Sequence, residues 1–155
     1  MVDFLVIGPF NSVSYKNIFP YIKDEIISLG YNRVGGFCDD MITNGIWFTT
    51  LYCIKKGLFL KEYEPGKYKE FDHFWAINID RTEDIPEYDG VMGVPITFLE
   101  KWNPEQFEIV DARDYRKDDK FKDMEVQMLS GSGGEMPAVE GKKMYARILI
   151  RKKKV

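Results

Sequence analysis

The first thirty residues combine a short apolar run with a longer amphipathic segment. Phe4–Ile7 is apolar throughout, which is typical of a parallel strand covered on both faces. Tyr15–Leu29 predicts a helix, because apolar residues recur at helical spacing on one face: Ile18, Ile22, Ile26 and Leu29. Pro20 either kinks this helix or marks its true first turn. The pattern predicts one β-α unit, with the Phe4 strand inside a doubly wound sheet.

The later part of the chain carries shorter strand patterns. The candidates are Ile46–Ile54, Trp75–Ile79, Val94–Leu99, Phe107–Val110 and Tyr145–Ile150. Pro95 makes the third of them an awkward central strand, because proline cannot donate to a strand ladder. We expect the last two to pair antiparallel. Together with the first β-α unit, these patterns predict a mixed α/β sheet with an antiparallel closing strand pair.

Composition bounds the class of protein. The chain has 155 residues, 45% of them hydrophobic and 15% aromatic, so residues 1–155 are expected to form a single folded domain. No apolar run approaches the length of a membrane span, and the N-terminus lacks a signal-peptide pattern. Cys38 and Cys53 have no metal-ligand spacing, so no metal site is predicted. We expect a cytoplasmic protein with reduced thiols.

Positive charge gathers at the end of the chain, although the formal net charge is −3. One interpretation is a solvated basic tail; the other is a strand end that contacts phosphate. Alternation along a strand places Arg147 and Arg151 on the same side. The candidate DNA phosphate contacts are Arg147, Arg151, Lys152, Lys153 and Lys154. They predict weak, salt-sensitive and sequence-independent DNA binding.

The segment Tyr88–Val110 carries the most specific signal in the chain. Its glycines, prolines, phenylalanines and amides stand at Gly90, Gly93, Pro95, Phe98, Asn103, Pro104, Gln106 and Phe107. In this order and spacing they resemble a signature segment of the EcoRI-type adenine-specific DNA methyltransferases. Those enzymes transfer a methyl group from S-adenosylmethionine to the exocyclic N6 of adenine in DNA. The resemblance covers nearly the whole chain and is weakest from Asp114 to Val139.

Two features of that family are missing from the sequence: the catalytic Asn-Pro-Pro-Phe/Tyr motif and the glycine loop that binds S-adenosylmethionine. The resemblance therefore implies the C-terminal portion of a restriction-modification methyltransferase, with a partial Rossmann-like class I sheet. S-adenosylmethionine would serve the complete enzyme. This chain alone is expected to be inactive and to bind the cofactor weakly at best.

The implied partners are DNA and a missing N-terminal half or partner subunit. Met1 directly before a strand is interpreted as a truncated chain or a gene split from its front half. A sheet cut at one edge exposes that edge strand, which a homodimer would cover. The rival to a methyltransferase part is a non-catalytic module that binds DNA or a subunit.

The resemblance also suggests a pocket for an adenine that has left the double helix, held by stacking and hydrogen bonds. Its candidate residues are Asn11, Asn44, Trp47, Phe48, Gly90, Gly93, Pro95 and Asn103. Each has a structural alternative. The aromatic residues could pack in the core, and the asparagines could serve turns or caps. The two glycines could permit a tight backbone path that positions Phe98 and Phe107.

Overall fold

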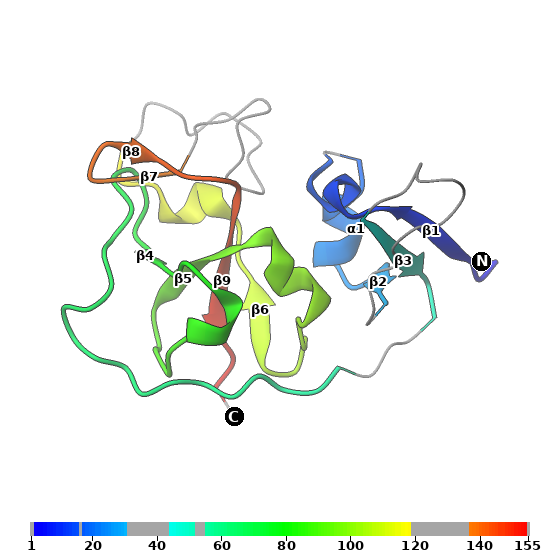
Figure 1. The fold of residues 1–155 in the computed structure, drawn as a ribbon, viewed down its shortest axis with the longest axis horizontal. Coiled ribbons are helices and arrows are strands. Elements are labelled where there is room, and N and C mark those ends of the chain that lie inside the picture. Colours follow the sequence, from blue (N-terminus) through cyan, green and yellow to red (C-terminus); the bar gives the residue numbers. More distant parts are fainter. Residues whose placement is uncertain (1, 16, 31–43, 52–54, 119–136, 155) are drawn as a thin grey trace. The chain divides into compact units, whose positions relative to one another are not determined.

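The computed structural model describes residues 2–15, 17–30, 44–51, 55–118 and 137–154. The chain divides into two compact units (Figure 1). The first comprises residues 1–56 and 99–102, and the second comprises residues 57–98 and 103–155. That all 155 residues act as a single domain stays a prediction.

The first unit contains an antiparallel sheet of three strands: β1 (Leu5–Pro9), β2 (Ser28–Leu29) and β3 (Gly45–Thr49). Their order is β1-β3-β2, so β3 runs antiparallel to both neighbours. A 3-10 helix (Phe10–Ser14) and the helix α1 (Phe19–Lys23) connect β1 to β2. Both helices bury aromatic and aliphatic side chains, as β3 does, and this gives the unit its core.

The predicted interior position of the Phe4 strand is wrong. β1 is an edge strand that pairs only with β3 within the described residues, and the pairing is antiparallel. Its side chains Leu5 and Val6 are 54% and 49% exposed. An apolar run of this length fits a buried strand and an open edge equally well, so the sequence pattern could not separate the two.

The predicted helix Tyr15–Leu29 is much shorter. α1 spans five residues, and Pro20 lies in its first turn, which confirms the second of the two alternatives for that proline. Glu25 adopts a left-handed backbone (φ 60°), which ends the helical path. Leu29 then joins β2 and is buried there. Two elements therefore share the apolar pattern that one helix was expected to carry.

The second unit contains a mixed sheet of four strands: β4 (Ile77–Asn78), β5 (Val91–Pro95), β6 (Phe107–Ile109) and β9 (Arg147–Lys152). The order is β4-β5-β9-β6 (Figure 1). β4 and β5 run parallel, whereas β9 is antiparallel to both β5 and β6. The predicted antiparallel pairing of the last two strand patterns is confirmed. The described chain as a whole is mixed α/β, as expected.

Shorter elements surround this sheet. β7 (Ala138–Val139) and β8 (Lys142–Lys143) form a hairpin. Three 3-10 helices span Thr82–Asp84, Ile96–Glu100 and Ala112–Tyr115. The predicted strand Val94–Leu99 is therefore shifted, because β5 ends at Pro95 and a 3-10 helix follows. Among the residues that the structure describes, no helix is long and apolar enough to cross a membrane.

The core of the second unit is rich in phenylalanine. Phe98 and Phe107 are fully buried and meet edge to face, with ring centroids 5.6 Å apart and an interplanar angle of 84°. Phe71 and Phe74 pack in a cluster with Leu149 of β9. The signature segment thus supplies core rings to this unit, as the structural alternative for it proposed.

Candidate nucleic-acid interface

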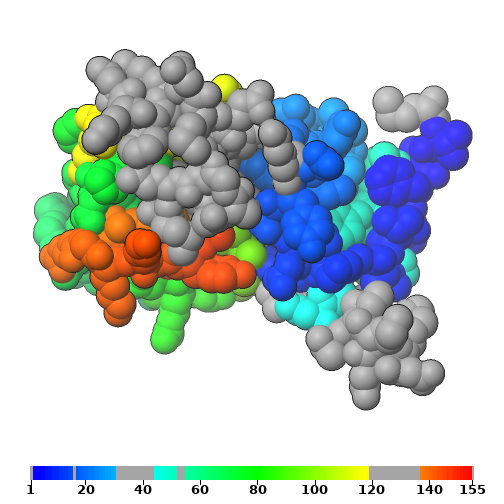
Figure 2. Space-filling model, turned by 90° about the horizontal axis from the view of Figure 1, so that it is seen from above, coloured from blue at the N-terminus to red at the C-terminus, as the bar shows by residue number. Residues whose placement is uncertain are grey.

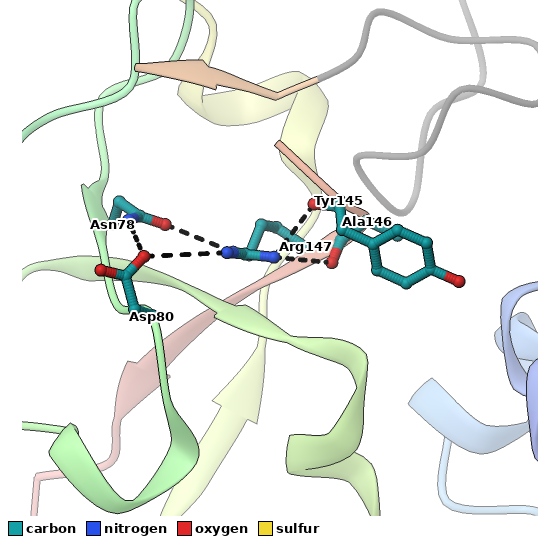
Figure 3. A network of polar contacts seen from close by, with 5 residues as sticks. All are labelled: Asn78, Asp80, Tyr145, Ala146 and Arg147. Atoms are coloured by element: carbon teal, nitrogen blue, oxygen red, sulfur yellow. Dashed lines mark hydrogen bonds and ion pairs between the residues drawn. The ribbon is translucent and has the colours of Figure 1, made fainter. Parts of the chain in front are cut away.

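Arg147 begins β9, and its side chain is only 7% exposed. Its guanidinium donates to Asn78 Oδ1 at 3.3 Å (Figure 3). It also donates to the carbonyl oxygens of Tyr145 at 3.0 Å and Ala146 at 3.3 Å. Asp80 Oδ1 lies 3.9 Å from its Nη2 and accepts from the Asn78 amide at 2.8 Å.

Burial lowers the pKa of Arg147, and the Asp80 carboxylate opposes that change. An arginine nevertheless remains charged in a protein. Because its donors are taken up by the protein, this predicted phosphate contact does not extend into solvent. It holds Asn78 and Asp80 in place instead.

A groove of about 750 Å³ opens beside Asn78 and Asp80, between the β7–β8 hairpin and the segment 67–69. Five lysines line it: Lys61, Lys67, Lys69, Lys142 and Lys143. The carboxylates in the lining are Asp80, Asp84 and Glu140. The lining therefore has more positive than negative side chains, and the groove attracts anions.

Ion pairs engage three of these lysines. The pairs are Lys61 with Asp84, Lys67 with Glu64 and Lys69 with Glu140. The hydrogen bond from Lys61 holds the pKa of Asp84 below its ordinary value. Lys142 and Lys143 are exposed, and neither forms an ion pair within the described ranges. Among the described residues, these two lysines have no carboxylate partner with which an anionic ligand would have to compete.

The β7–β8 hairpin presents both of these lysines. Its two turn residues, Glu140 (φ 50°) and Gly141 (φ 75°), have left-handed backbones, as a two-residue type I′ turn requires. The Asp72 carboxylate accepts a hydrogen bond from each turn amide, at 2.8 Å in both cases. The hairpin tip is thus fixed to a distant segment. Sequence reasoning missed this hairpin, for which Gly141 ahead of the two lysines was the available signal.

A stack of tyrosine rings adjoins the groove, which Tyr68 helps to line. Tyr63 stacks on Tyr68 with ring centroids 5.8 Å apart, and on Tyr88 with centroids 4.7 Å apart. Burial raises the pKa of Tyr88, and Tyr63 adds to the effect. Gly90, a predicted base-pocket residue, lies against the Tyr88 ring, because a Cβ there would come within 2.4 Å of it. Gly90 therefore makes room for this stack.

The other predicted phosphate contacts lie at the opposite end of β9. Arg151 donates to Glu108 at 2.7 Å, and Lys152 donates to Glu87 at 2.9 Å. These hydrogen bonds raise the pKa of Arg151 and of Lys152. A hollow of about 650 Å³ lies there, lined by Lys152, Lys153, Lys154, Glu87, Asp89 and Glu105 and by two uncharged residues, Leu60 and Gln106. Its cationic and anionic side chains balance.

The base-pocket candidates of the second unit have structural roles. Gly93 lies in β5 under the Phe71 ring, which a Cβ would approach to 2.2 Å. Neither it nor Gly90 has a left-handed backbone, so close ring packing explains these glycines. Pro95 ends β5 opposite Arg147. Asn103 Oδ1 accepts from the backbone amide two residues later at 2.9 Å, which is a turn-capping bond.

The remaining candidates lie in the first unit. Phe48 is a core residue of β3, 6% exposed. Trp47 is half-buried and lies against Gly30, whose Cβ would come within 2.7 Å of it. Asn11 and Asn44 each use a backbone carbonyl, to accept from the Ser14 hydroxyl and the Phe10 amide respectively. A base pocket that combines all eight residues stays a prediction. Within the described residues, no group of three or more potential ligand side chains could hold a metal.

Comparisons with known proteins find one matching family and several relatives. The family described as adenine-specific methyltransferase EcoRI matches residues 39–153. Type II methyltransferase M.EcoRI from Escherichia coli is 34% identical over 98% of the chain. Two mycoplasma relatives are M.MgeORF184P from Mycoplasma genitalium, 32% identical over 99%, and M.MpnI from Mycoplasma pneumoniae, 30% identical over 97%. The chain covers 51%, 58% and 57% of these relatives, or about half their length. No solved structure matches it.

Proposed function

The chain belongs to the EcoRI adenine-specific methyltransferase family, and we propose that it supplies one part of a type II DNA adenine N6-methyltransferase. The observation that carries the proposal is the family match over residues 39–153, together with relatives that align along nearly the whole chain. Because the chain spans about half of those relatives, a second segment would complete the enzyme. The catalytic Asn-Pro-Pro-Phe/Tyr motif, absent from this sequence, would belong to that segment.

We also assign a Rossmann-like class I sheet to the completed enzyme. The second unit supports this assignment, because its sheet has a parallel pair, β4 and β5, beside an antiparallel closing strand, β9. The sheet of the first unit has only antiparallel pairs among the described strands. β1 has an open edge among the described strands, with two exposed aliphatic side chains. We assign that edge to the second segment, because an unpaired strand edge readily accepts another strand.

The methyl donor would be bound outside the groove of this chain. S-adenosylmethionine carries a positive sulfonium, and a groove lined by five lysines disfavours a cation. The lining residues therefore do not fit the donor. The donor belongs with the segment that completes the enzyme.

This chain would contribute DNA contacts and part of the base pocket. Trp47 is the aromatic candidate best placed for stacking, since it is half-buried whereas Phe48 is in the core. Lys153 and Lys154 are exposed candidates for phosphate contact. Arg151 and Lys152 would have to share their carboxylate partners with a phosphate.

Reconstitution tests the proposal. The full chain is mixed with the half of M.EcoRI that it does not cover, and transfer of radiolabelled methyl to an adenine-containing duplex is measured. We expect transfer by the mixture and none by either component, because positioning of both substrates requires the complete site. Methyl transfer by this chain alone would contradict the proposal. A mixture that binds DNA and donor but transfers nothing would favour the non-catalytic binding module.

A further inference from the structure

We propose that the groove beside the β7–β8 hairpin is a binding site for the phosphate backbone of duplex DNA. The inference rests on the proposed function for the choice of DNA as the anion. It assigns the principal phosphate contacts to Lys142 and Lys143, and Lys67 also belongs to the lining. The basic C-terminal end, which the sequence favoured, takes a smaller part.

The charge balance of the two hollows decides between them. The groove has five lysines against three carboxylates, whereas the hollow at the C-terminal end has three of each. A phosphate entering the C-terminal hollow meets as many negative as positive side chains. A phosphate entering the groove meets two lysines that have no carboxylate partner among the described residues. Attraction to a polyanion is therefore stronger at the groove.

The hairpin also presents its lysines at low entropic cost. The type I′ turn and the two hydrogen bonds from its amides to Asp72 fix the backbone before any ligand binds. Figure 2 shows the hairpin residues, coloured orange, open at the surface of this face. DNA binding then orders only the two lysine side chains, so little conformational entropy is lost. More of the favourable free energy of charge neutralisation therefore remains as affinity.

Arg147 supports the groove from the interior. It holds Asn78 and Asp80, both lining residues, in one arrangement through the network of Figure 3. Arg147 is thus a positioning residue and not itself a phosphate contact. Its charge, held in a buried site, adds to the positive potential of the groove.

The two candidate regions are far enough apart to be tested separately. Arg147 and Lys152 mark the two ends of β9, which are about 17 Å apart at the usual rise per strand residue. Figure 1 shows the β7–β8 hairpin at the first end and the C-terminus at the other. A pair of lysines can therefore be neutralised at either end without changing the other.

The test compares two variants of the full chain with equal loss of charge. Lys142→Gln/Lys143→Gln changes the groove, and Lys153→Gln/Lys154→Gln is the matched control. Binding of a mixed-sequence DNA duplex is followed by fluorescence anisotropy across a salt series. We expect the groove variant to bind about tenfold more weakly at low salt and its salt slope to fall by roughly 2, since each phosphate contact contributes about 0.9. The control should keep most of its affinity and slope.

The inference would be overturned if both variants lost the same affinity for the duplex, or if the groove variant bound the duplex as tightly as the unchanged chain. Acylation of lysines with and without duplex gives an independent measurement on the unchanged chain. Lys142 and Lys143 should be protected by DNA more than Lys153 and Lys154, and the reverse order would contradict the proposal. Preference for an RNA duplex would also contradict it. Neither measurement uses methyl transfer, so failure here leaves the reconstitution test of the proposed function intact.

Discussion

Single glycines in the segment Tyr88–Val110 make room for aromatic rings. Gly90 lies against Tyr88, and Gly93 lies under Phe71. Neither needs the left-handed backbone that glycine allows. The sequence could show that small residues recur here, but it could not show which rings they face, because Phe71 reaches Gly93 from a different part of the chain. Packing accounts for these two positions in the folded unit.

Replacement of Gly93 by alanine should destabilise the protein strongly. The added Cβ would lie 2.2 Å from the Phe71 ring, and that ring is fully buried and cannot move aside. We expect a loss of about 3 kcal/mol in the free energy of unfolding, at the upper end for overpacking. Urea denaturation of the variant and of the unchanged chain measures this loss, provided that the two proteins have the same m-value.

Gly57→Ala is the matched control for this change. Its nearest neighbour would be Gln106 Oε1 at 3.4 Å, an ordinary contact. Its effect should stay within about 0.5 kcal/mol, as for most surface changes. Similar stability losses for the two variants would show that close approach of Phe71 does not explain Gly93.

At the scale of elements, local patterns predicted some strands and missed other features. β9 and its pairing with β6 could be predicted, because both are apolar runs with a buried face. The end of the helix predicted from Tyr15 could not be located from the sequence. It depends on the left-handed backbone of Glu25 and on the pairing of Leu29 with β3. The β7–β8 hairpin was missed since its tip is held by Asp72, 68 and 69 residues earlier in the chain. Long-range hydrogen bonds of this kind leave no periodicity in the sequence.

Replacement of Asp72 by alanine should release the hairpin tip. The amides of Glu140 and Gly141 would lose their carboxylate acceptor, so their hydrogen exchange should become about tenfold faster or more. Duplex binding should weaken as well, although both hairpin lysines remain. Exchange measured by NMR or mass spectrometry checks the first effect.

Glu70→Ala serves as the control, because that carboxylate pairs with Lys117, whereas both turn amides donate to Asp72. Its exchange rates at the turn should stay unchanged. If Asp72→Ala also leaves both amides protected, backbone pairing of β7 with β8 alone holds the hairpin.

At the scale of the whole molecule, the family was predictable and the interface was not. The residues of the signature segment are specific enough to indicate the family, which the comparisons confirm. The accessibility of each charge depends on tertiary partners instead. Arg147 is buried among carbonyls, and Arg151 and Lys152 face carboxylates from other strands and loops. A count of basic residues along the chain therefore favoured the C-terminal end over the hairpin groove.

The open edge of β1 predicts self-association of the chain when no second segment is present. An unpaired strand edge with exposed Leu5 and Val6 can pair with the same edge of another copy. We expect light scattering to show a mass that rises with concentration towards a dimer. Val6→Lys should suppress this rise, because a charge on the edge opposes strand pairing.

Ile26→Lys is the control for Val6→Lys. It adds the same charge at a residue that is 46% exposed and outside the strands, so this variant should associate like the unchanged chain. A chain that stays monomeric at high concentration, or equal behaviour of the two variants, would rule out β1 as the association edge.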